Sequence, residues 1–294
     1  MIVVTAATGQ LGRLVVEGLL ARVPAEGTAV EGLAVEGLAV AVRSPEKAAA
    51  WAARGVEVRE ADYGRPETLA TAFRAGDTVL LISGSEVGAR VAQHTAVVDA
   101  AAAAGAARIV YTGVLGGDEA GFDLAAEHKA TEAAILASGL PYTFLRNGWY
   151  TENYTDQAAG AVERGVVLGS SGDGPVASAS RADYAAAAVA VLTGEGHENR
   201  AYELSGDEAW TQSAYAAELA AQSGRPVAYV DVSPQEHRAA LVGAGLPEGF
   251  ADILVDVDAA IGRGELARDR GVLSALIGRP TTPLADSVKA ALGT

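Results

Sequence analysis

Residues 2–12 read IVVTAATGQLG and join a short apolar run to a small-residue turn and the start of a helix. The run Ile2–Val4 is typical of a buried parallel strand, and apolar residues three and four apart from Leu11 onward predict an amphipathic helix. A strand, turn and helix in this order direct backbone N–H groups and a helix N-terminus at one point, which suits a pyrophosphate. The alternative is a tight turn that binds nothing. We expect a dinucleotide site formed by Ala6, Ala7, Thr8, Gly9, Gln10, Leu11 and Gly12.

The glycine pattern of this turn departs from the usual one. It reads Ala6-x-x-Gly9-x-x-Gly12, so an alanine stands where the first of three glycines is expected. If the turn requires a positive φ at this position, the Cβ of Ala6 costs energy that a glycine would not. We therefore expect a suboptimal phosphate turn.

Composition excludes several classes of function. The chain has 294 residues and a net charge of −15, and nucleic acids and membrane surfaces favour basic proteins instead. It has no cysteine, and its four histidines are scattered, so we expect neither disulfides nor a metal site. No signal segment precedes the first strand and no apolar stretch is long enough for a bilayer, so we expect no membrane insertion and a cytoplasmic location.

Strands and helices alternate through the first half of the chain, which predicts a doubly wound parallel sheet, the NAD(P)-binding Rossmann fold. The expected strands are Ile2–Thr5, Leu38–Val42, Val56–Arg59, Thr78–Ile82, Arg108–Thr112 and Tyr142–Arg146. The expected helices between them include Pro45–Ala53, Pro66–Phe73, Val87–Ala104 and Leu124–Ser138.

The second half is less regular. We divide the chain into a dinucleotide-binding domain, 1–146, and a smaller, mostly helical substrate lobe, 147–294, with some strands returning to the main sheet. Helices are expected at Arg181–Leu192, Thr211–Gln222, Pro234–Val242 and Phe250–Gly262, and a strand at Ala201–Leu204. The lobe is expected to close over the carboxyl edge of the sheet. A tandem repeat of AVEGL, 29–38, interrupts the first half and reads as an inserted loop or edge extension.

Arg43 follows the second expected strand, where NAD-specific sites usually carry an acid for the ribose 2′-hydroxyl. A guanidinium can hold a 2′-phosphate with two hydrogen bonds, so Arg43 favours NADPH over NADH. A solvated arginine at a strand end is the alternative. Asp62 follows the third strand. Its position suits a contact with the adenine of the dinucleotide, and the alternative is a turn that begins the next helix. The small residues Ser83, Gly84 and Ser85 follow the fourth strand and either admit the cofactor or cap a helix, and the two roles are compatible.

The chain resembles the NmrA-like branch of the atypical short-chain dehydrogenases, and within it the type 2 NADPH quinone oxidoreductases. The segments that carry the resemblance are TAATGQLG, AVRSPEKA, READYG, LLISGSEVG, QHTAVVDAA, PYTFLRNGWYTENY, ASASRADYAAAA and GRPTTPLADSV. They extend over nearly the whole chain. The resemblance implies NADPH bound by residues 6–11, by Arg43, by 83–85, and by Asn147, Gly148, Trp149, Tyr150, Thr151 and Glu152.

Proton chemistry has few candidates. The Tyr-x-x-x-Lys pair of tyrosine-dependent short-chain dehydrogenases corresponds here to Ala125 and Lys129, so the tyrosine is missing. A quinone needs a strong acid less than a ketone does, because hydride arrival gives a stabilised aromatic anion. His128 and Lys129 are candidates to stabilise that anion or donate a proton, and an exposed helix face is the alternative for both.

Trp149 and Tyr150 follow the sixth expected strand, at the edge where such folds bind ligands. They are candidates to flank a flat acceptor, with Tyr150 a catalytic candidate, and packing between the two parts of the chain is the alternative. We expect an NADPH-dependent oxidoreductase that transfers a hydride to a quinone. The alternatives are a non-enzymatic NADP(H)-sensing regulator and a reductase of another activated acceptor, such as an enone or azo compound. The sequence leaves undecided whether the chain forms a homodimer.

Overall fold

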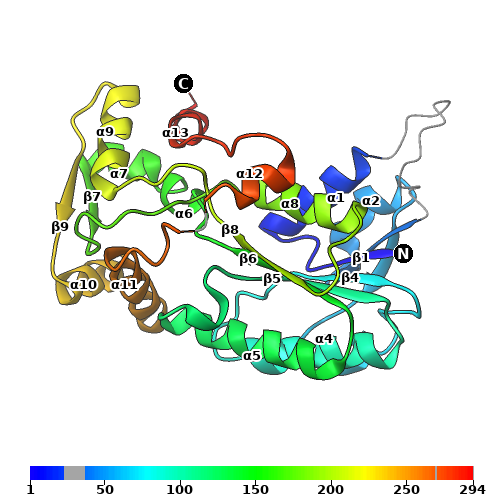
Figure 1. The fold of residues 1–294 in the computed structure, drawn as a ribbon. Coiled ribbons are helices and arrows are strands. Elements are labelled where there is room, and N and C mark those ends of the chain that lie inside the picture. Colours follow the sequence, from blue (N-terminus) through cyan, green and yellow to red (C-terminus); the bar gives the residue numbers. More distant parts are fainter. Residues whose placement is uncertain (23–36, 269, 294) are drawn as a thin grey trace. The chain divides into compact units, whose positions relative to one another are not determined.

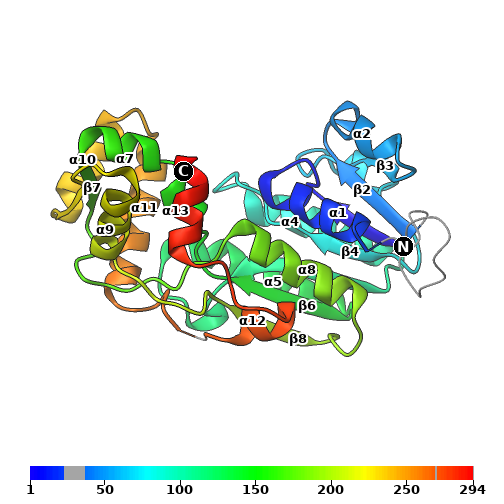
Figure 2. The same ribbon diagram turned by 90° about the horizontal axis from the view of Figure 1, so that it is seen from above.

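The computed structural model describes residues 1–22, 37–268 and 270–293 of the chain. Its main sheet has seven strands in the order β3-β2-β1-β4-β5-β6-β8, which is the doubly wound order with one strand added at the β6 edge (Figure 1 and Figure 2). The expected parallel, doubly wound fold is confirmed. In chain order the strands are β1 (Ile2–Thr5), β2 (Leu38–Val42), β3 (Glu57–Glu60), β4 (Thr78–Leu81), β5 (Arg108–Val114), β6 (Tyr142–Asn147) and β8 (Arg200–Leu204).

Helices pack on both faces of this sheet (Figure 2). On one face, α3 (Pro66–Leu69), α4 (Arg90–Ala103) and α5 (Asp123–Ser138) cover a core built from β1, β2, β4, β5 and β6. On the other face lie α1 (Gln10–Leu20) and α8 (Arg181–Thr193). A Cβ built on Gly18 of α1 would come within 2.9 Å of Val189 in α8, so the glycine permits these two helices to pack closely.

The chain forms two compact units. Unit 1 comprises Met1–Gly117, Glu127–Arg146 and Tyr184–Tyr202, and unit 2 comprises Asp118–Ala126, Asn147–Asp183 and Glu203–Thr294. That the first acts as a cofactor domain and the second as a substrate lobe stays a prediction. The elements of unit 2 are α6 (Glu152–Thr155), α7 (Ala158–Arg164), β7 (Val166–Gly169), α9 (Gln212–Ser223), β9 (Ala228–Asp231), α10 (Pro234–Gly243), α11 (Glu248–Gly262), α12 (Val272–Ile277) and α13 (Leu284–Leu292).

The structure adds to the expectations for unit 2. The strands β7 and β9 pair in parallel as a small separate sheet that the sequence analysis missed. Each has only four residues, too few to display a clear period. The helices α7, α12 and α13 were also missed, whereas α9, α10 and α11 lie within two residues of the expected helices.

Three expected helices of unit 1 are shorter than predicted. The helix expected at Pro45–Ala53 is a 3₁₀ turn, η2 (Pro45–Ala48), followed by α2 (Ala49–Ala52). The helix expected at Pro66–Phe73 ends at Leu69, and the one expected at Val87–Ala104 begins only at Arg90. Gly88 has a φ of 86°, a left-handed conformation that is incompatible with an earlier helix start.

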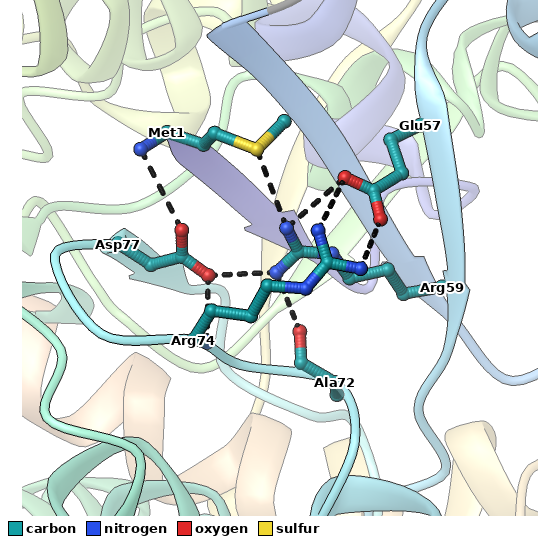
Figure 3. A network of polar contacts seen from close by, with 6 residues as sticks. All are labelled: Met1, Glu57, Arg59, Ala72, Arg74 and Asp77. Atoms are coloured by element: carbon teal, nitrogen blue, oxygen red, sulfur yellow. Dashed lines mark hydrogen bonds and ion pairs between the residues drawn. The ribbon is translucent and has the colours of Figure 1, made fainter.

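The amino end of the sheet holds a buried ion-pair network (Figure 3). Arg59 of β3 donates to Asp77 Oδ2 (2.7 Å) and to the Ala72 carbonyl (2.8 Å), and it contacts Glu57 Oε2 (3.1 Å). The side chains of Arg59 and Asp77 are only 4% and 3% exposed. The Arg74 N–H also donates to Asp77 (2.9 Å), so the network joins β3 to the residues that precede β4.

The repeat at 29–38 lies almost wholly outside the described residues, so its interpretation as an insertion stays a prediction. None of the helices within the described ranges combines the length and apolar character needed to cross a membrane.

Candidate cofactor-binding and active site

The turn between β1 and α1 has the backbone geometry that a phosphate site requires. Ala6 adopts a φ of 47°, in the left-handed region, as the glycine pattern led us to consider. The N–H of Gly9 donates to the Ala6 carbonyl at 2.9 Å and closes the turn. Gly9 then serves as the N-cap of α1 in an extended conformation, without a side-chain cap. The N–H groups of the first helical turn consequently have no side-chain acceptor at this cap and can serve an anion.

Gly12 explains why the helix can begin so close to the strand. A Cβ at Gly12 would lie 2.5 Å from the Ala6 carbonyl oxygen and 2.7 Å from the Ala7 Cα, distances that no side chain tolerates. The last glycine of the pattern is therefore required by helix-to-turn packing, as it is in dinucleotide folds. Ala7, at 0% exposure, lies in the core beneath the turn.

Arg43 lies just after β2 with its side chain 69% exposed. Its Nη1 atom is 3.6 Å from Glu86 Oε1, in the loop that follows β4. The guanidinium is therefore at the carboxyl edge of the sheet and accessible to a ligand. Its expected contact with a 2′-phosphate stays a prediction.

Asp62 has a local structural role. Its Oδ1 accepts a hydrogen bond from the Gly64 N–H (3.0 Å), and its own N–H donates to Thr68 Oγ1 (2.9 Å) in α3. These bonds support the helix-initiating alternative for Asp62, and the adenine contact stays a prediction. The neighbouring Tyr63 is more informative, because its hydroxyl donates to the Ile82 carbonyl (3.0 Å) and is also bonded to Thr5 Oγ1. Tyr63 thus ties the ends of β1 and β4 together.

The loop 83–88 is held from below by buried polar side chains. The Ser83 N–H donates to Thr112 Oγ1 (2.9 Å), and the Gly84 N–H donates to His94 Nε2 (2.9 Å). Burial and the nearby Arg90 lower the pKa of His94 to about 3, so its imidazole is neutral at pH 7. Since Nε2 accepts, the proton is on Nδ1, which lies 3.0 Å from Thr131 Oγ1.

Arg90 and Glu127 complete this support. Arg90 Nε donates to the Gly84 carbonyl (2.8 Å), and Arg90 Nη1 donates to Glu127 Oε2 (3.1 Å). The other oxygen of Glu127 accepts the Gly88 N–H (2.9 Å). One buried arginine and one carboxylate thus fix both ends of the loop. We call Arg90, His94 and Glu127 the clamp. The sequence offered no periodic signal for it, because it joins α4 and α5 to a loop.

His128 is buried, so the exposed-face alternative is wrong for this residue. Only 7% of it is accessible, and its Nδ1 is 2.7 Å from the Tyr111 hydroxyl of β5. Burial, with Arg90 and His94 nearby, lowers the pKa of His128 to about 3. The imidazolium that a proton donor would require is therefore absent at neutral pH. The catalytic role of His128 stays a prediction that this geometry does not favour. Lys129 is half-buried on α5.

The segment after β6 is tied to the residues before α8. The Ala179 N–H donates to the Trp149 carbonyl (3.2 Å), and the Thr151 N–H donates to the Ala179 carbonyl (3.0 Å). The Glu152 carboxylate accepts the N–H of Arg181 (2.9 and 3.0 Å) and so caps α8. Gly148 uses its N–H in a bond to the Leu204 carbonyl (2.7 Å).

Tyr150 and Asn147 are the residues of this segment whose polar side chains can interact with a bound molecule. Burial raises the pKa of the Tyr150 hydroxyl, and the Arg181 guanidinium lies 5.6 Å from the ring centroid. Asn147 is 5% exposed, and its buried Oδ1 has no hydrogen-bond partner among the described residues. A buried carbonyl oxygen without a donor is costly, so Asn147 is suited to accept a hydrogen bond from a ligand.

Comparison with known proteins identifies the family. A model of NAD(P)H-binding proteins matches residues 6–195, which include the turn, Arg43 and the loop after β4. The chain belongs to this NAD(P)H-binding family. It is 49% identical to quinone oxidoreductase 2 of Escherichia coli K12 over 98% of this chain and 97% of that protein. The resemblance stated from the sequence is confirmed.

Solved structures agree with the family assignment. The NADPH-dependent quinone oxidoreductase of Escherichia coli, complexed with NADPH, superposes with a TM-score of 0.92 at 49% identity and covers 99% of this chain and 100% of its own. The Citrobacter triphenylmethane reductase complexed with NADP(H) gives 0.91 at 41% identity, over 99% and 100% of the two chains. An NAD(P)H azoreductase of Xenophilus azovorans is 30% identical over 99% of this chain and 97% of that protein.

Proposed function

We propose that the protein is an NADPH-dependent oxidoreductase that reduces a quinone to the hydroquinone in one two-electron step. The observation that carries this proposal is the near full-length identity to a quinone oxidoreductase, 49% over 98% of the chain, with a TM-score of 0.92 to its NADPH complex. A seven-strand dinucleotide fold with the turn Ala6–Gly12 at its centre supports it.

The residues present fit NADPH. The turn offers backbone N–H groups to the pyrophosphate, and Gly12 allows the helix to approach the strand closely enough to present them. Arg43 is a cation at the place where the 2′-phosphate is expected. Asn147 Oδ1, which has no hydrogen-bond partner in the described part of the chain, offers an acceptor to an amide N–H, such as that of a nicotinamide carboxamide.

The protein's own side chains then orient the reactants. When bound, NADPH would supply the hydride; the quinone that accepts it would become an aromatic anion stabilised by its own ring and would take one proton from solvent to give the hydroquinone. Trp149 and Tyr150 provide flat surfaces beside Asn147, which suits an aromatic acceptor. The Tyr150 hydroxyl is protonated at neutral pH, as an ordinary tyrosine is, and burial raises its pKa further. His128 is neutral and hydrogen-bonded to Tyr111, so we assign it a structural role and leave Lys129 as the candidate to stabilise the anion.

The test is oxidation of NADPH by the purified protein with a panel of quinones, in the presence and absence of NADH as competitor. Tyr150→Phe should retain most activity, since the ring is kept, whereas Tyr150→Ala should raise the KM for quinone. If the protein binds NADPH tightly but no quinone, enone or azo compound oxidises it, the proposal of an enzyme is wrong. The alternative of a non-enzymatic NADP(H)-sensing regulator would then remain.

A second acceptor class has specific support. Relatives that match nearly the whole chain are named as an azoreductase and a triphenylmethane reductase, so extended aromatic dyes belong in the panel. A kcat/KM for dyes above that for quinones would reassign the substrate without changing the cofactor. The cytoplasmic location, the homodimer and the exclusion of nucleic acid stay predictions.

A further inference from the structure

The ion pair between Arg43 and Glu86 joins two different loops at the carboxyl edge of the sheet. Arg43 follows β2, and Glu86 lies in the loop after β4. Since β2 and β4 are the two neighbours of β1, the pair passes across the end of β1, where the turn at Ala6 begins. A ligand anchored on that turn and on Arg43 would therefore lie close to Glu86.

Glu86 is held in this position from the other side. Its Oε2 accepts a hydrogen bond from Gln93 Nε2 on α4 at 2.7 Å, while Oε1 faces Arg43. Its loop is fixed in turn by the bonds of His94, Arg90 and Glu127 described above. The carboxylate is consequently a fixed negative charge beside the guanidinium.

The contact with Arg43 is loose. At 3.6 Å between Nη1 and Oε1 it is longer than a hydrogen bond, and the two side chains are 69% and 58% exposed. A carboxylate that prepared Arg43 for a phosphate would orient it through short, directed bonds. At this distance Glu86 contributes charge without orientation, so it partly neutralises the cation.

We propose that Glu86 sets cofactor specificity by competing with the 2′-phosphate of NADPH for Arg43. The inference rests on the proposed function for the assignment of Arg43 to that phosphate. A ribose 2′-phosphate is an anion. Glu86 weakens its attraction to the Arg43 guanidinium by partly neutralising that cation, and Glu86 also repels the phosphate directly. The 2′-hydroxyl of NADH is neutral and feels neither effect. Glu86 therefore lowers the preference for NADPH that Arg43 creates.

The test is the dissociation constant of each dinucleotide, measured by calorimetry on wild type and Glu86→Gln. The amide keeps the size of the side chain and removes its charge. The Kd for NADPH should fall about two- to fivefold at low salt, the range of an exposed ion pair, and the Kd for NADH should hardly change. The gain should shrink as salt screens it. The control is Glu248→Gln, which removes the same charge from an exposed pair with Arg238 in unit 2 and should alter neither Kd.

A second variant separates competition from general repulsion. In an Arg43→Ala background, Glu86→Gln should produce a clearly smaller gain in NADPH affinity, because the cation for which the two anions compete is gone. Weaker NADPH binding by Glu86→Gln would show that Glu86 orients Arg43, and an equal gain for both dinucleotides would show that it acts without reference to the phosphate. Either result overturns the inference while leaving quinone reduction intact, since the function is tested separately by NADPH oxidation.

Discussion

Unit 1 carries an arginine–carboxylate pair at each end of its sheet, and the two pairs differ in burial. Arg59 and Asp77 lie at the amino end, 4% and 3% exposed, with short bonds to each other and to the backbone. Arg43 and Glu86 lie at the carboxyl end, 69% and 58% exposed and 3.6 Å apart. The same chemistry thus stabilises the fold at one end and stays available to a ligand at the other.

The difference follows from the direction of the strands. In a parallel sheet the carboxyl ends lead into the loops that face the ligand, whereas the amino ends can be closed by packing. A buried charge must be paired, so the amino-end arginine is bound to specific partners through its Nη atoms. An exposed arginine at the carboxyl end keeps its solvation and can exchange partners at small cost.

Among the substitutions, the largest expected effect is on the buried pair. Asp77→Asn removes the buried anion of Arg59 and leaves only the longer contact with the less buried Glu57, so it should lower the free energy of unfolding by about 3–5 kcal/mol. Urea denaturation of wild type and variant measures this change in the free energy of unfolding. The control Glu67→Gln, which removes the exposed acid 3.1 Å from Arg65, should change stability little. A small effect of Asp77→Asn would show that water reaches the network and would remove the contrast between the two ends.

At the exposed end, Arg43→Ala should affect binding instead of folding. We expect NADPH binding to weaken by about 1–3 kcal/mol, the value of a charge-assisted hydrogen bond, with NADH binding little altered. Equal losses for the two dinucleotides in titration calorimetry would refute the assignment of Arg43 to the 2′-phosphate.

Two buried histidines beneath the carboxyl-end loop predict a response to acid. The folded pKa values of His94 and His128 are about 3, below the ordinary 6.5, so the unfolded chain binds protons that the folded protein does not. Their stabilisation is complete above pH 6.5 and is lost as the pH falls toward 3. As the pH falls through that range, protonation of each histidine in the unfolded chain should lower the free energy of unfolding by about 1.4 kcal/mol per pH unit. NMR titration of either ring near pH 6.5 would contradict this.

The smallest effect is expected at the turn itself. Ala6 is held at a φ of 47°, where a Cβ is strained, so Ala6→Gly should stabilise the fold by about 1 kcal/mol in urea denaturation. Ala7→Gly is the matched control, since Ala7 is buried outside the left-handed region and its loss should destabilise. An unchanged stability together with tighter NADPH binding would place the strain in the bound turn alone.

Local pattern was sufficient where a single segment specifies its own structure. The strands β1 and β2 begin and end at the predicted residues, because short continuous apolar runs are typical of strands in a sheet covered on both faces. The short strands β7 and β9 were missed, since four residues each carry little periodic signal and their pairing joins residues about 60 positions apart.

The candidate cofactor site was predictable to the extent that it is built from backbone. The turn from Ala6 to Gly12 and the position of Arg43 follow from the order of strand, turn and helix. The clamp of Arg90, Glu127 and His94 beneath the loop after β4 was not predictable, because it joins residues of α4 and α5 to that loop only through side-chain contacts.

The sequence by itself determined the fold class, the family and the cation at the end of β2, because these depend on residue type and local order. Only the tertiary structure decided which polar groups are buried. It made His128 a neutral partner of Tyr111, left Asn147 Oδ1 without a donor among the described residues, and set Glu86 beside Arg43. The physical reason is that desolvation and pairing depend on the distances between side chains of different elements, which no linear pattern contains.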